Sequence, residues 1–150
     1  MVQALKNCMD DDWVAELRFA SVLLLRKMMD YIRDDIDYED FKEVYPELLK
    51  RLDDSQDGIR IEAAKTFEVF FETLMDPWSG SLYDYIIKNI FIHLDDPSLK
   101  IQDAITATLK IAATKHTDQF IEIAADCQAK FAHPQLCKNL YDFAVSYKNR

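Results

Sequence analysis

A chain of 150 residues, of which 49% are hydrophobic, is long enough to bury the core of one domain without a metal ion or a disulfide. Its two glycines and four prolines are too few for the turns of β-sheets and the phosphate-binding loops of nucleotide folds, so the composition favours an all-α structure. The net charge of −9 comes from residues 1–76, which carry 19 acidic against 10 basic side chains, and no basic stripe suited to DNA or RNA is present.

The first predicted long helix follows Asp12. Apolar or small residues recur there at the spacing of one helix face: Leu17, Ser21, Leu24, Leu25, Met28 and Ile32. Residues 1–9 before it hold too few apolar side chains for a full partner helix. We therefore expect the chain to begin inside a repeat, as a fragment of a longer protein, with the apolar face of this helix partly uncovered.

Two further pairs of helices follow. The first helix of each pair is predicted from Phe41, Val44, Tyr45, Leu48, Leu49 and Leu52, and from Leu82, Ile86, Ile87, Ile90, Phe91 and Leu94. The second helix is predicted from Ile59, Ala63, Phe67, Phe70, Phe71 and Leu74, and from Ile101, Ala104, Ile105, Thr108, Leu109 and Ala112. Short aspartate-rich turns join the two helices of each pair.

A sequence period of 42 residues relates these helices. Asp12, Asp54 and Asp96 each precede an aliphatic residue and a polar one at the same spacing: Leu17 with Arg18, Ile59 with Arg60, and Ile101 with Gln102. Three copies in constant register predict repeated helical hairpins. Because the pattern recurs, we predict that its polar residues cap the turns and hydrogen-bond neighbouring repeats, and are not catalytic groups: Asp12, Arg18, Asp54, Arg60 and Asp96. In the third copy we expect Asp96 to cap the helix and Pro97 to take the first helical position.

The last two predicted helices depart from this period. Their apolar residues are Phe120, Ile121, Ala124, Cys127 and Phe131, then Leu136, Leu140, Phe143, Ala144 and Tyr147. A degenerate last repeat suits the end of a solenoid, whose outer face meets water. We predict one all-α domain over residues 1–150, with repeats at about 1–33, 39–75, 82–114 and 118–148.

At this point the residues resemble a known family. Residues 46–54 with Ile59, Arg60 and the two alanines at 63 and 64 are similar to the consensus of HEAT repeats: a first helix containing proline, an aspartate turn, then an aliphatic–basic pair and small residues. The resemblance implies an armadillo-like α-solenoid of antiparallel helical hairpins that binds other proteins. Gln102 departs from the basic residue of the pattern without changing the class.

A narrower resemblance covers roughly residues 40–145. Residues 45–54, residues 93–105 and the helices around Cys137 resemble the C-terminal repeats of HEAT-repeat factors that preassemble axonemal dynein arms for cilia. That resemblance implies a cytoplasmic, chaperone-like scaffold without catalytic residues, whose partners are axonemal dynein chains and chaperones. A scaffold in nuclear transport, phosphatase regulation or chromosome organisation would rest on the same repeats and stays open.

No group of residues points to catalysis or to a cofactor. Gly58 and Gly80 are isolated, so a glycine-rich phosphate loop is absent. His116, Cys127, His133 and Cys137 raise the question of zinc, but no CxxC or HxxxH spacing accompanies them. We expect no enzyme, no metal and no cofactor, and we interpret Cys127 and Cys137 as core residues.

The cellular setting is inferred from cysteine use and hydropathy. Three widely separated cysteines, without a basic and apolar leader, are typical of the reducing cytosol. The longest purely apolar run, residues 22–25, is too short to cross a bilayer. We expect a cytoplasmic protein with no membrane partner.

The predicted binding surface is charged. In HEAT repeats the second helices line the concave side, so we expect residues beside their packing face to meet a partner: Glu62, Lys65, Glu68 and Glu72, with Glu16 and Arg26 one repeat earlier. The loop after the first long helix adds Asp34, Asp35, Asp37, Glu39 and Asp40 to this surface. Trp78 lies in a later turn. The acidic surface suits a basic client segment. These charges could equally be a solvated surface with no partner. Trp78 could equally anchor a partner or cover the repeat beneath it.

Overall fold

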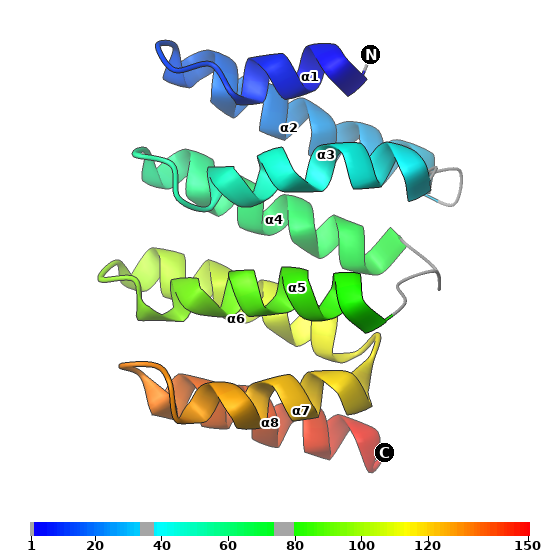
Figure 1. Cartoon of the computed structure of the whole chain (residues 1–150), viewed down its shortest axis with the longest axis vertical. Helices are drawn as coiled ribbons and strands as arrows, with labels where there is room; N and C mark the ends of the chain where they lie inside the picture. Colours follow the sequence, from blue (N-terminus) through cyan, green and yellow to red (C-terminus); the bar gives the residue numbers. More distant parts are fainter. Residues whose placement is uncertain (1, 34–37, 74–79) are drawn as a thin grey trace. The chain divides into compact units, whose positions relative to one another are not determined.

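The computed structural model describes residues 2–33, 38–73 and 80–150, which form eight α-helices, one 3-10 helix and no strand (Figure 1). The all-α prediction is confirmed, and consecutive helices pack in pairs as helical repeats do. The helices divide into two compact units, residues 1–77 and 78–150. Their arrangement as one solenoid domain stays a prediction. None of the described helices combines the length and apolarity needed to cross a membrane.

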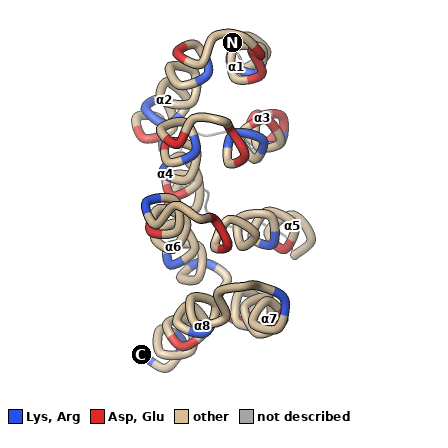
Figure 2. The backbone as a smooth tube through the Cα atoms, turned by 90° about the vertical axis from the view of Figure 1, so that its left-hand side faces the viewer, with Lys and Arg blue, Asp and Glu red and all other residues tan. Residues whose placement is uncertain are grey.

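The first unit contains two helical hairpins. Its helices are α1 (Val2–Met9), α2 (Ala15–Ile32), α3 (Tyr38–Arg51) and α4 (Asp57–Thr73). Helix α1 packs against α3 and α2 against α4, so the unit has two layers (Figure 2). Fully buried side chains from both layers form the core: Val22, Phe41, Leu48, Phe67, Phe70 and Phe71. Phe41 and Phe70 join the two helices of the second hairpin, with ring centroids 4.0 Å apart.

The apolar face of α2 is partly uncovered, as the sequence predicts. Leu17 and Leu24 on its apolar stripe are 38% and 50% exposed, and Ile32 is also exposed. The residues one repeat later, Ile59 and Thr66, are buried on the face of α4 that meets α2. Among the described residues, no helix covers the equivalent face of α2. The apolar period therefore identified a real stripe, but not whether a neighbour buries it.

The second unit repeats the hairpin arrangement. It comprises α5 (Gly80–Phe91), the 3-10 helix η2 (Ile92–Asp95), α6 (Leu99–Ala113), α7 (Thr117–Gln128) and α8 (Pro134–Lys148). Helix α5 packs beside α7, and α6 beside α8. The Phe91 ring contacts two rings of the last hairpin, with centroids 5.6 Å from Phe120 and 6.4 Å from Phe131.

Tyr83 is a core residue that the apolar pattern of α5 did not include. Its side chain is fully buried, and its hydroxyl donates a hydrogen bond of 2.9 Å to the carbonyl oxygen of Ala112. Burial raises the pKa of Tyr83, so the phenol stays neutral. The bond ties the start of α5 to the end of α6.

We expect Tyr83→Phe to lower the free energy of unfolding by about 1 kcal/mol, the usual net contribution of one hydrogen bond. The loss stays modest because the Ala112 carbonyl also accepts the backbone N–H of Lys115. Urea unfolding followed by circular dichroism measures it. Tyr85→Phe, at a half-exposed site of the same helix, is the control, and equal effects of the two variants would contradict the assignment.

Candidate functional site

A buried ion pair connects the two hairpins of the first unit. Arg18 on α2 forms two hydrogen bonds to the Asp54 carboxylate in the α3–α4 turn: Nε to Oδ2 at 2.7 Å and Nη2 to Oδ1 at 3.0 Å. The two side chains are only 9% and 2% exposed. Burial would raise the pKa of Asp54, but hydrogen bonds from Arg18 and from the Gln56 backbone N–H outweigh it and lower the pKa. These residues therefore position the hairpins.

The polar residue of each repeat copy also donates to its own turn. Arg18 Nη1 bonds the carbonyl oxygen of Asp11 at 2.9 Å, and Arg60 Nε bonds that of Leu52 at 3.1 Å. Gln102 Nε2 bonds that of Asp96 at 2.7 Å. All three donors satisfy a backbone carbonyl in the turn before a second helix. Glutamine can replace arginine here because the bond needs an N–H group and no charge.

Asp12 does not have the predicted capping role. In the first turn the neighbouring Asp11 carboxylate accepts the backbone N–H groups of Trp13 and Val14, at 2.9 and 2.7 Å. Asp12 is exposed, with no side-chain hydrogen bond among the described residues. Any of three consecutive aspartates could accept the backbone N–H groups of this turn. The 42-residue spacing pointed to Asp12, but Asp11 is the acceptor.

Pro97 also lies outside its predicted position. Asp96 accepts the backbone N–H of Ser98 at 2.8 Å, and α6 begins at Leu99. The proline was expected to be the first helical residue but lies two residues before the helix. Asp54 forms the same local bond with the Gln56 N–H at 3.0 Å. In both turns the aspartate carboxylate accepts the backbone N–H of the second residue after it, and the helix begins one residue later.

The predicted binding residues of α4 separate into two groups. Glu62 is buried and ion-paired with Arg26 of α2, so its prediction as a partner-facing residue is wrong. The cause is a partner 36 residues earlier that could not be read from the helix itself. Lys65 and Glu72 are exposed, and Glu68 is half-buried on the same face.

The predicted acidic loop is only partly described. Glu39 and Asp40 are exposed in the first turn of α3, where Glu39 forms an ion pair of 2.9 Å with Lys42. Asp34, Asp35, Asp37 and Trp78 lie outside the described residues, so their binding roles stay predictions.

The histidines and cysteines considered for zinc are not assembled into a metal site. Within the described residues, no group of three or more His, Cys, Asp or Glu side chains is placed to hold a metal ion. The His116 ring lies 4.9 Å from that of Tyr83, and His133 pairs with Asp95. Cys127 and Cys137 are buried free thiols. Burial raises the pKa of Cys127 to about 11, which keeps it protonated at neutral pH.

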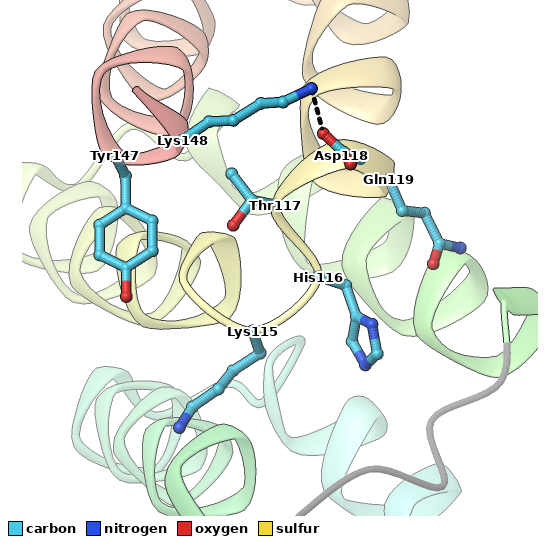
Figure 3. Close-up of a pocket in the computed structure, with 7 residues that line it drawn as sticks. All are labelled: Lys115, His116, Thr117, Asp118, Gln119, Tyr147 and Lys148. Atoms are coloured by element: carbon cyan, nitrogen blue, oxygen red, sulfur yellow. Dashed lines mark ion pairs between the residues drawn. The ribbon is translucent and has the colours of Figure 1, made fainter. Parts of the chain in front are cut away.

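A polar hollow of about 540 Å³ lies in the second unit, at the turn before α7 (Figure 3). Lys115, His116, Thr117, Asp118, Gln119, Tyr147 and Lys148 line it. Asp118 and Lys148 form an ion pair of 2.6 Å, which neutralises both charges. Sequence reasoning missed this hollow because Tyr147 and Lys148 come from the far end of the next helix.

A smaller, more apolar groove lies in the first unit between the beginnings of α2 and α4. Ala15, Glu16 and Phe19 line it from α2, and Gln56, Gly58 and Ile59 from α4 and the turn before it. Its volume is about 280 Å³. Only Glu16 had been predicted to face a partner. Phe19, 38% exposed, was the available signal, because it is aromatic yet lies off the predicted packing face.

The chain is similar along most of its length to known proteins, although no family model matches it. It is 25% identical over 134 residues to dynein axonemal assembly factor 5 of Xenopus laevis and 28% identical over 144 residues to that of Mus musculus, which are 87% and 93% of the chain. It is 40% identical over 78 residues, 49% of the chain, to that of Homo sapiens. The matches cover 16%, 17% and 9% of these longer proteins. The chain is therefore a distant homologue of a segment of dynein axonemal assembly factor 5.

Proposed function

We propose that this chain is a protein-binding scaffold that acts without catalysis in the cytoplasmic preassembly of axonemal dynein arms. Axonemal dynein chains and chaperones are the partners that this role implies. The observation that carries the proposal is the similarity to dynein axonemal assembly factor 5 along most of the chain. The paired helices support it, because stacked helical hairpins offer extended surfaces for proteins.

The proposed contact surface is the outer face of α4 together with the first turn of α3. Lys65 and Glu72 are exposed on α4, and Glu39 and Asp40 on α3. Both helices are anchored by the buried core of the first unit, so these charges are carried on ordered elements. Acidic groups in such a setting attract basic client segments and speed their encounter.

The test is affinity capture from a lysate of ciliated cells, with the 150-residue chain as bait and quantitative mass spectrometry as the readout. We expect axonemal dynein chains and chaperones to be enriched on the native bait. A variant with Glu39→Gln, Asp40→Asn and Glu72→Gln should capture them less strongly, because three acidic groups of the surface are neutralised.

The matched control neutralises three exposed acidic residues of the second unit, with Asp103→Asn, Glu122→Gln and Asp126→Asn. Equal losses on both variants would show that total charge matters and would remove the surface assignment. Capture of importins, phosphatase subunits or condensin-like proteins in place of dynein would assign the scaffold to another pathway.

A further inference from the structure

The apolar groove of the first unit has features of a docking site for one side chain. Figure 1 shows the α1–α2 and α3–α4 turns on the same side of the unit, and the groove lies where α2 and α4 leave these turns. At about 280 Å³ it is smaller than the roughly 300–1,000 Å³ of pockets that enclose drug-sized ligands. A single apolar side chain matches it better than a cofactor.

The residues that line the groove leave room and a free polar group for a ligand. An ideal Cβ built on Gly58 would meet no atom within 4 Å, so the helix backbone borders open space there. The Gln56 side-chain amide forms no hydrogen bond with the described residues, and it can donate to and accept from a peptide backbone. Phe19 supplies a half-exposed aromatic wall. Apolar walls with a few polar groups are the usual lining of a ligand site.

The charges around the groove are acidic. Glu16 lines it, and Asp12 is exposed in the turn before α2. The nearby Asp57 and Arg60 lie 3.5 Å apart as an ion pair, so their charges offset each other. A partner with a positive charge beside its apolar residue would therefore be attracted, and one with a negative charge repelled.

We propose that this groove binds an extended segment of a partner protein in which one apolar side chain is flanked by lysine or arginine. The apolar side chain enters between Phe19 and Gly58, and the basic residues beside it are attracted by Glu16. This inference rests on the proposed function, because it assigns a surface and a partner chemistry to the scaffold. It predicts binding that is local, selective for basic flanks and weakened by salt.

The first experiment is an NMR titration of the ¹⁵N-labelled chain with the peptide Gly-Ser-Lys-Leu-Lys-Ser-Gly. We expect saturable shifts of the backbone amides of Ala15, Phe19 and Gly58. Peptides with Glu-Leu-Glu or Lys-Ser-Lys at the centre should bind about tenfold more weakly or not at all, since each lacks one of the two recognised features. Equal binding of the three peptides, or no shift with the first, would overturn the proposal.

The decisive variant is Gly58→Leu, which fills the groove from open space and raises helix propensity, so the fold is expected to persist. Unchanged helicity with loss of the peptide shifts would support the groove, and unchanged binding would overturn it. Gly80→Ala, at the start of α5, is the control and should bind as the native chain does.

The same variant separates this inference from the proposed function. If Gly58→Leu still captures dynein chains from the lysate at the native level, the groove is not the contact, although the scaffold role stands. If the native chain captures none but binds the peptide as expected, the proposed pathway fails while the groove stands.

Discussion

Asp54→Ala is expected to lower the free energy of unfolding by about 3–5 kcal/mol, because it leaves the buried Arg18 guanidinium without its counter-charge. The variant also removes the acceptor for the Gln56 N–H and the ion pair with Arg51, which is 3.2 Å away. Urea unfolding measures the loss. Hydrogen exchange should assign it to α2, α3 and α4, the helices that meet at this pair.

Asp12→Ala is the matched control, since Asp12 occupies the same position of the repeat but is exposed. Its effect should stay within about 0.5 kcal/mol. A double variant with Arg18→Met and Asp54→Leu should recover much of the loss, because apolar replacements for both partners remove the unpaired charge. A loss below about 1 kcal/mol for Asp54→Ala alone would show that water reaches the pair.

The same ion pair predicts a sensitivity to acid. The pKa of Asp54 in the folded chain is lowered from its ordinary 3.8, so its contribution to stability is complete above 3.8 and is lost as pH falls through the folded value. The difference in unfolding free energy between the native chain and Asp54→Asn should shrink steadily below about pH 4. Urea midpoints from pH 7 to pH 2 measure it, and a difference independent of pH would contradict the role of the carboxylate.

Phe91→Ala is expected to lower the free energy of unfolding by about 3–5 kcal/mol in the second unit. Phe91 is fully buried and packs against the rings of Phe120 and Phe131, so alanine leaves a cavity within the α5–α7 layer. Phe120 is held by α7 and Phe131 by the turn after it, so the rings cannot fully collapse into the space. Urea unfolding gives the loss, and faster hydrogen exchange in α5 and α7 would locate it.

The control for this cavity is the next residue. Ile92 is 55% exposed, so Ile92→Ala removes an aliphatic side chain that is largely in water already. We expect an effect of less than about 1 kcal/mol. If the two variants were equally destabilised, the loss would reflect local helix propensity and not the aromatic contacts.

The helices and their pairing could be predicted because both depend on short-range spacing. Phe67, Phe70 and Phe71 occur at helical intervals, and all three are buried. Burial against a neighbour does not follow from this spacing, and the uncovered face of α2 was predicted only from the few apolar residues before it. Leu17 and Ile59 have equivalent positions in the repeat, yet only Ile59 is covered, because coverage depends on the adjacent hairpin.

The candidate site was less predictable than the fold because it depends on residues that meet only in three dimensions. Glu62 looked like a surface charge on its own helix, but Arg26 on another helix buries and pairs it. Phe19 and Gly58 are distant in the sequence and line the same groove. Gly58 has no side chain, so an apolar or charged sequence pattern could not identify it. It contributes to the groove by leaving open space beside the helix backbone.

The turn hydrogen bonds shared by the repeats have an evolutionary consequence. Arg60 and Gln102 occupy equivalent positions, and each donates to a carbonyl oxygen of its own turn, so selection can exchange a charged donor for a neutral one without losing this kind of bond. Arg18 lacks this freedom because it must also neutralise Asp54. A lineage can therefore adjust the charge of one repeat to suit a new client while its backbone is inherited unchanged, and homologous repeats can diverge in partner well before they diverge in shape.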